Sequence, residues 1–96
     1  MLKKILFVDD EAQILKSIRR LFMDTEYEVI TAESGSEALD ILANNKIDLI
    51  VSDMRMPNMS GYELLREVKR RFPHIVRIIL SGLLKKESYL MHYKKT

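Results

Sequence analysis

The sequence contains no cysteine among its 96 residues. This absence excludes disulfide bonds, metal sites built from thiolates and catalysis by a cysteine nucleophile. It also fits a reducing compartment, because disulfide bonds are rare in proteins of the cytosol. Any chemistry of this chain must therefore come from other side chains.

A long apolar run near the start is missing as well. The apolar segment Ile5–Val8 is followed at once by Asp9 and Asp10, so it is too short for the core of a signal peptide. With 47% hydrophobic and 31% charged residues, the composition favours a globular protein over a disordered or membrane-inserted chain. We therefore expect one cytoplasmic domain that does not associate with a membrane.

The chain has little excess charge and few residues of the types that build other common sites. A formal charge of +2, without a basic stripe interleaved with aromatic residues, argues against nucleic acid as a partner. The histidines His74 and His92 have no partner at metal-ligand spacing, so we assign both to the surface. A glycine-rich phosphate loop is also missing, since residues 33–37 contain one glycine and predict a helix start.

Four short apolar segments, rich in β-branched or aromatic residues, predict β-strands. These strands are Ile5 to Val8, Tyr27 to Thr31, Leu49 to Val51 and Val76 to Leu80. Three of the four are continuously apolar, which is typical of strands covered on both faces in a parallel sheet. The segment from Tyr27 to Thr31 alternates more and fits the edge of a sheet.

Apolar residues at helical spacing lie between these strands. They form three groups: Ala12, Leu15, Ile18, Leu21 and Phe22; Ala38, Leu39 and Leu42; Leu64, Leu65, Val68 and Phe72. Ser34 and Ser60 each have a glutamate three residues later, the spacing of a helix-capping box, and Pro73 ends the third helix. A further helix is expected from about Lys85 to Tyr93. Alternating strands and helices predict an α/β fold with a doubly wound parallel sheet.

Three acidic residues follow or end strands of the predicted sheet. Asp9 and Asp10 come directly after the first strand, and Asp53 ends the third. Each alone has an ordinary explanation as a helix cap, a turn residue or a loop start. Together they should meet at the carboxyl edge of the sheet, where such folds bind ligands. Carboxylates packed at one site repel each other unless a cation or a shared proton relieves the repulsion.

A divalent metal is the simplest relief for this repulsion. Ligation by oxygen alone points to Mg²⁺, which binds one or two carboxylates and a phosphate oxygen while keeping several waters. Such a site suits phosphoryl transfer, and an aspartate can itself be the acceptor. Asp53 stands alone at its strand end and is the natural acceptor, whereas Asp9 and Asp10 are a pair suited to holding the ion.

Three segments resemble motifs of the receiver domain of two-component response regulators, in the same order and spacing. They are Phe-Val-Asp-Asp-Glu at 7–11, Asp-Met-Arg-Met-Pro-Asn-Met-Ser-Gly at 53–61 and Ile-Ile-Leu-Ser-Gly at 78–82. The resemblance covers roughly Lys3 to Gly82. It implies a flavodoxin-like sheet of four strands in the order 2-1-3-4, within a receiver-like phosphoacceptor domain over residues 1–82.

The resemblance also implies a role for individual residues. Asp53 matches the phosphoacceptor and is also one of the metal ligands. Asp10 matches the acid that binds Mg²⁺ directly, and Asp9 its neighbour that binds largely through water. Arg55 matches the position whose backbone carbonyl completes the coordination. The donor would be a sensor histidine kinase, a phosphotransfer protein or a small phosphodonor. The chain would then be a phosphoprotein of a phosphorelay and not a turnover enzyme.

Other residues match positions that shape or read the site. Pro57 and Gly61 match turn residues of the loop that follows the acceptor. Ser81 matches the switch hydroxyl that reaches the phosphoryl oxygens once Asp53 is modified. The methionines of the loop are expected to fill space rather than bind a cofactor: Met54, Met56 and Met59.

The segment 83–96 departs from the family pattern. The family continues through a longer fourth helix, a fifth strand ending in lysine and a last helix, so the domain is expected to be truncated after the fourth strand. Residues 83–96 would form an atypical basic tail, which is predicted to be helical. Lys85 and Lys86 follow Ser81 too closely to replace the family lysine, and its absence should weaken phosphorylation or the response to it. An alternative is therefore an interaction or dimerisation module that no longer responds to phosphate.

Loss of a fifth strand would leave Val76–Leu80 at an edge of the sheet, and apolar edges invite pairing. We therefore expect a homodimer that exchanges its fourth strands or its tails. A third possibility is a Mg²⁺-dependent hydrolase of phosphate esters that uses the same acids. Arg55 disfavours it, because Arg55 stands where such an enzyme needs its general acid.

Overall fold

The computed structural model describes residues 3–80 and 93–95 of the chain. Strands and helices alternate along it: β1 (Lys4–Val8), α1 (Ala12–Leu21), β2 (Glu28–Ala32), α2 (Gly35–Asn44), β3 (Leu49–Asp53), α3 (Gly61–Arg71), β4 (Val76–Leu80) and β5 (Tyr93–Lys95). The first four strands are parallel and stand in the order β2-β1-β3-β4. The predicted doubly wound, flavodoxin-like sheet of order 2-1-3-4 is confirmed.

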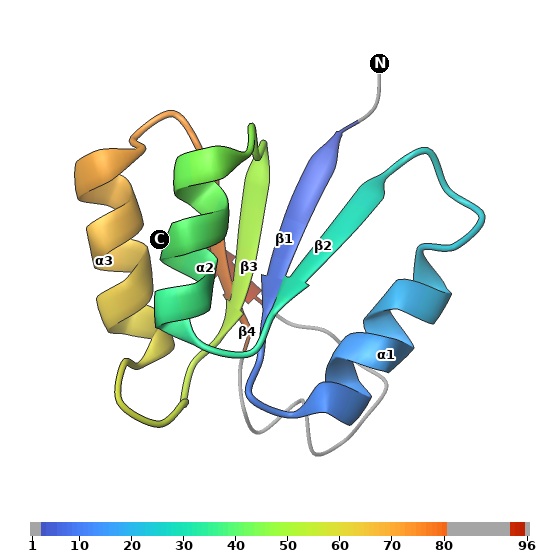
Figure 1. Cartoon of the computed structure of the whole chain (residues 1–96), viewed down its shortest axis with the longest axis horizontal. Helices are drawn as coiled ribbons and strands as arrows, with labels where there is room; N and C mark the ends of the chain where they lie inside the picture. Colours follow the sequence, from blue (N-terminus) through green and yellow to red (C-terminus); the bar gives the residue numbers. More distant parts are fainter. Residues whose placement is uncertain (1–2, 81–92, 96) are drawn as a thin grey trace.

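The helices cover both faces of this sheet, with α1 on one face and α2 and α3 on the other (Figure 1). Alternate residues of a strand point to opposite faces. Within β1, Ile5 and Phe7 therefore pack in the cluster with α1, whereas Leu6 and Val8 pack with α2 and α3. This double covering explains why β1 reads as a continuous apolar run in the sequence.

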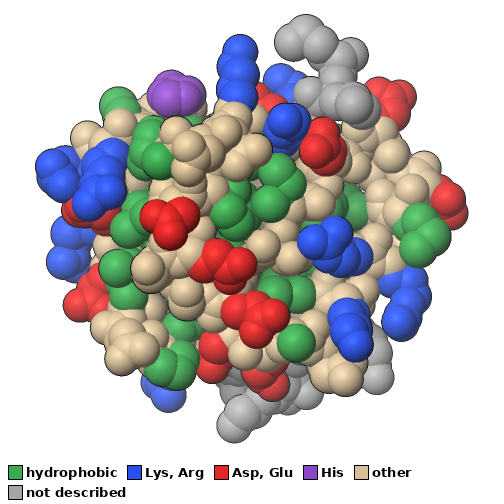
Figure 2. Space-filling view, in the orientation of Figure 1, with side chains coloured by type: hydrophobic (Ala, Val, Ile, Leu, Met, Phe, Trp, Pro, Cys, Tyr) green, Lys and Arg blue, Asp and Glu red, His purple; other side chains and the backbone are tan. Residues whose placement is uncertain are grey.

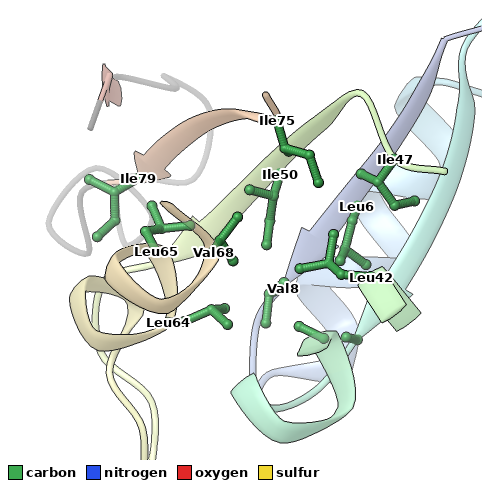
Figure 3. Packing of buried hydrophobic residues seen from close by; sticks show 12 residues of the cluster. Leu6, Val8, Leu42, Ile47, Ile50, Leu64, Leu65, Val68, Ile75 and Ile79 are labelled. Atoms are coloured by element: carbon green, nitrogen blue, oxygen red, sulfur yellow. The ribbon is translucent and has the colours of Figure 1, made fainter. Parts of the chain in front are cut away.

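The larger core cluster lies between the sheet and the pair α2 and α3. Leu6, Ile50, Leu64 and Val68 have no exposed surface there, and Figure 3 shows strand side chains meeting those of α3. The smaller cluster lies under α1 and includes Phe7, whose ring centroid is 5.4 Å from that of Phe22. Two clusters on opposite faces hold the central strands β1 and β3 in place.

Both predicted serine caps are present. The Ser34 hydroxyl accepts from the Glu37 backbone N–H at the start of α2. Ser60 and Glu63 form a full capping box at the start of α3, with the Glu63 carboxylate accepting from the Ser60 N–H at 2.8 Å. These bonds from Ser60 hold the pKa of Glu63 below its usual value. The start of α3, directly after the loop that follows β3, is therefore well fixed.

The C-terminal strand β5 corrects two predictions. Tyr93 begins a strand and so does not end a helix, while the remainder of the predicted helix, residues 85–92, lies outside the described residues. β5 pairs antiparallel with β4, Leu80 lying opposite Tyr93, so the expected edge position of Val76–Leu80 is wrong. The backbone groups of β4 pair within the same chain, and the exchange of strands in a homodimer stays a prediction.

Among the described residues, none of the helices combines the length and the apolar character that a transmembrane span requires.

Two leucines of similar chemistry but opposite burial give a test of this core. Leu64 has no exposed surface, whereas 65% of Leu21 is exposed at the end of α1. Leu64→Ala should lower the free energy of unfolding by about 2–5 kcal/mol, because it leaves a cavity in the larger cluster. Leu21→Ala should change it by less than about 0.5 kcal/mol. Urea denaturation measures both values, and similar losses in the two variants would contradict this packing.

Candidate metal centre

The three acidic residues singled out from the sequence meet at the carboxyl edge of the sheet. β1 and β3 are adjacent and parallel, with Val8 opposite Ser52, so the residues that follow these two positions end side by side. One carboxylate oxygen from each of Asp9, Asp10 and Asp53 lies within 4.8 Å of the others. The predicted convergence is therefore observed.

The three carboxylates differ in burial. Asp9 and Asp53 are 2% and 3% exposed, whereas Asp10 is exposed. Hydrogen bonds hold Asp9 in place: its Oδ1 accepts from the Glu11 N–H at 2.8 Å, and its own N–H donates to the Ala32 carbonyl at 3.1 Å. The site thus has a fixed buried floor and an open side at Asp10.

Asp10 is not used to start the first helix. The residue at the N-cap of α1 is Glu11, and it makes no side-chain capping bond. The ordinary explanation of Asp10 as a helix cap is therefore wrong. Its side chain instead contributes to the carboxylate cluster.

The donor set fits a hard divalent cation. Among the described residues, aspartate oxygens alone make up this cluster, without histidine. Oxygen ligands of this kind suit Mg²⁺ or Ca²⁺ rather than a soft transition metal. Three like charges at this spacing repel by an amount on the order of a few kcal/mol, which a bound cation would reverse. Figure 2 shows acidic side chains grouped across the centre and lower half of the visible face.

The loop after β3 carries two of the residues that the sequence placed at the site. Arg55 and Pro57 are exposed on it. The Met59 N–H donates to the Pro57 carbonyl at 2.7 Å, and Asn58 between them has a positive φ of 70°. This is the geometry of a γ-turn, in a region of φ that asparagine tolerates better than most residues. The Pro57 carbonyl thus takes part in a tight turn, while its loop-shaping role stays a prediction.

Gly61 is the first residue of α3 and packs directly on the strand end that carries Asp53. A Cβ atom at position 61 would overlap the Asp53 carbonyl oxygen and lie 3.1 Å from the Met54 Cα. The Gly61 N–H donates to the Met54 carbonyl at 2.9 Å. A residue without a side chain is thus required for α3 to begin this close to β3.

The three methionines pack as the sequence suggested. Met54, Met56 and Met59 are partly buried against the larger core cluster. Of the remaining predicted residues, His74 is exposed, while Ser81 and His92 lie outside the described residues. The switch role of Ser81 therefore stays a prediction.

Sequence reasoning missed one residue at the site. Ser52 has no exposed surface, and its hydroxyl donates to the Asp53 carbonyl at 3.0 Å. The available signal was its position, because it is a polar residue between the apolar run Leu49–Val51 and the acceptor candidate. The apolar run stops at Val51, and β3 continues through Ser52 to Asp53, which ends the strand as predicted.

Comparison with known proteins gives the same pattern from several sides. The family model of the response regulator receiver domain matches residues 5–95 of the chain. The chain is 42% identical over 78 residues to the hydrogenase transcriptional regulatory protein HoxA of Cupriavidus necator, and 41% identical over 79 residues to the response regulator MprA of Mycobacterium sp.. These alignments cover 81% and 82% of the chain, but only 16% and 34% of the two relatives. The chain thus spans well under half of their length.

Solved structures show the same likeness. A receiver domain protein from Clostridium thermocellum superposes with a TM-score of 0.77 at 43% identity, over 88% of this chain and 70% of that one. The response regulator protein TrrA of Thermotoga maritima, in complex with Mg(2+)-BeF, gives a TM-score of 0.80 at 34% identity. That match covers 92% of this chain and 76% of TrrA.

The two glycines near the loop offer a matched test of its geometry. Gly61→Ala should lower the free energy of unfolding by about 1–3 kcal/mol or more, because the new methyl group meets backbone that cannot move independently. Gly35→Ala should be milder, because its nearest obstacle, 2.5 Å away, is the sulfur of the flexible Met59 side chain. Thermal unfolding measures the difference. Equal losses would mean that Gly61 is not held against Asp53.

Proposed function

Since this chain belongs to the response regulator receiver domain family of two-component signalling, we propose that it accepts a phosphoryl group on the Asp53 carboxylate. The observation that carries the proposal is the meeting of three carboxylates at the carboxyl edge of the sheet. The donor is a sensor histidine kinase, a phosphotransfer protein or a small acyl phosphate. A partner that responds to the phosphorylation would bind the surface that changes around Asp53.

The three acids divide the work. Asp9, Asp10 and Asp53 would hold a Mg²⁺ ion, with Asp10 on the open side of the site and the Arg55 backbone carbonyl as a further ligand. When bound, the ion neutralises charge on the moving phosphoryl group and on Asp53. Asp53 is 3% exposed and lies on a central strand, so its carboxylate has little freedom to change direction. Positioning of this kind is the main contribution of a protein to phosphoryl transfer.

The reaction forms an acyl phosphate. A carboxylate oxygen of Asp53 bonds to the phosphorus while the bond from phosphorus to the donor nitrogen or oxygen breaks. The electron pair of that bond stays with the leaving group, which can then take up a proton. No water enters the reaction, so the chain takes up one phosphoryl group per cycle rather than turning over an ester substrate.

Ser81 is the proposed reader of the modified state. Phosphorylation adds negative charge and acceptor oxygens at Asp53, and a serine hydroxyl can donate to one of them. Such a new bond would bias the segment after β4 toward the acceptor. Ser81 directly follows Leu80, which lies opposite Asp53 in the sheet.

One observation favours a second candidate, an interaction module that does not respond to phosphate. β5 is antiparallel, with Lys94 opposite Ile79 and Lys95 opposite Ile78. Both lysines therefore occupy register positions farther from the carboxyl edge than Leu80. Within the described residues, β5 thus brings no lysine to the carboxyl edge as an equivalent of the lysine that ends the family's fifth strand.

Phosphoryl uptake distinguishes the two candidates. The protein should gain one phosphoryl group, seen by intact mass spectrometry, when incubated with Mg²⁺ and a small acyl-phosphate donor. Asp53→Asn should abolish the adduct. Asp48→Asn should not, because Asp48 lies at the opposite end of the sheet and accepts from the Lys4 N–H at 2.9 Å. A parent protein without an adduct would favour the interaction module, and steady release of phosphate from an ester would favour a hydrolase.

Metal binding can be followed by stability alone. Without Mg²⁺, Asp10→Asn should raise the unfolding temperature, because it removes one of three repelling charges. With Mg²⁺ at about 100 times its dissociation constant, the parent should gain about 2.7 kcal/mol, or roughly 10–20 °C. Asp10→Asn should lose most of this gain and Asp48→Asn should keep it. If Asp10→Asn destabilised the metal-free protein, the carboxylates would not be in mutual repulsion.

A further inference from the structure

Ser52 is a buried polar residue that the proposed reaction does not use. It lies in β3 next to Asp53 and has no exposed surface. Strand alternation places it on the same face as Ile50, toward α2 and α3 rather than toward α1. Its hydroxyl donates to the Asp53 carbonyl oxygen at 3.0 Å. A hydroxyl in this position therefore acts on the backbone of the acceptor residue.

The Asp53 carbonyl is held from two directions. The Ser52 hydroxyl binds it, and Gly61 at the start of α3 packs so closely that a Cβ atom would overlap it. The next carbonyl, that of Met54, accepts from the Gly61 N–H at 2.9 Å. Two successive peptide units after β3 are thus fixed against the first turn of α3, which the Ser60 and Glu63 capping box itself holds.

The orientation of this peptide matters for the metal site. The carbonyl direction of Asp53 reports its ψ angle, which sets how the chain leaves the strand. The peptide lies between the Asp53 carboxylate and Arg55, whose carbonyl is a proposed metal ligand. A rotation here would move these two ligands relative to each other. Small misplacements of reacting groups are costly, since about 1 Å can change a rate by roughly a hundredfold.

We infer that Ser52 is a positioning residue: its hydroxyl fixes the Asp53–Met54 peptide and thereby the relative placement of the Asp53 carboxylate and the Arg55 carbonyl toward the cation. This inference rests on the proposed function. The alternative is a merely structural role, in which the Ser52 hydroxyl binds the Asp53 carbonyl only because a buried hydroxyl needs a hydrogen-bond partner. Such a role would change stability but would leave the Mg²⁺ affinity of the folded protein unchanged.

A matched pair of variants isolates the hydroxyl. Ser52→Thr keeps a hydroxyl and Ser52→Val lacks it, while both add similar volume to the same closed position. We expect the Mg²⁺ dissociation constant to be about tenfold higher for Ser52→Val than for Ser52→Thr, which corresponds to about 1.4 kcal/mol of binding free energy. Titration calorimetry on the folded proteins measures both constants. In the metal-free protein, the ¹³C resonance of the Asp53 carbonyl should also differ between the two, since only Ser52→Thr retains its donor.

Equal Mg²⁺ affinity in the two variants would overturn the inference, even if Ser52→Val were less stable. Should the added volume unfold both variants, Ser52→Ala against the parent gives the same comparison without overpacking. The acceptor function is tested separately by mass spectrometry. A parent that binds Mg²⁺ but takes up no phosphoryl group would refute that function, while the affinity difference would still decide the role of Ser52.

Discussion

Mutual repulsion of three carboxylates at one edge of a parallel sheet is the constraint on which the rest of the site depends. The register of β1 and β3 forces Asp9 and Asp53 to end side by side, and the chain direction places Asp10 next to them. A fold gains no stability from this arrangement without a cation. The remaining structure must therefore hold the acids together against their charge, and the two core clusters on either side of β1 and β3 do this.

The position of Asp53 is fixed by backbone contacts and not by the acids themselves. The strand end at Asp53 is covered by the start of α3, and the contact is close enough to require glycine at position 61. The capping box of Ser60 and Glu63 fixes that helix start. The start of α3 in turn fixes the backbone after Asp53 through the hydrogen bond from the Gly61 N–H to the Met54 carbonyl. The loop between them includes a turn with positive φ at Asn58, which closes the short path from β3 to α3.

The sequence predicted most of the fold because its local signals agree with one another. Continuous apolar runs, helical stripes and serine caps all indicated the same alternating order. β5 was not predicted, because Tyr93–Lys95 is short and basic, and its place comes from the unpaired edge of β4 rather than from its own propensity. Ser52 was missed for a related reason: a single serine in a strand carries no pattern, and its role comes from an atom of the next residue.

The strands that lead to the three acids lie in the centre of the sheet, and the C-terminal strands lie toward one edge. The three acids come from β1 and β3, which have neighbours on both sides and helices on both faces. β4 and β5 lie beyond them, and β5 pairs with β4 rather than with either strand that leads to the acids. An unusual β5 therefore leaves the convergence of Asp9, Asp10 and Asp53 intact. In the proposed function, any effect of β5 should fall on how a modified Asp53 is read, because the proposed reader Ser81 directly follows Leu80, which pairs with β5.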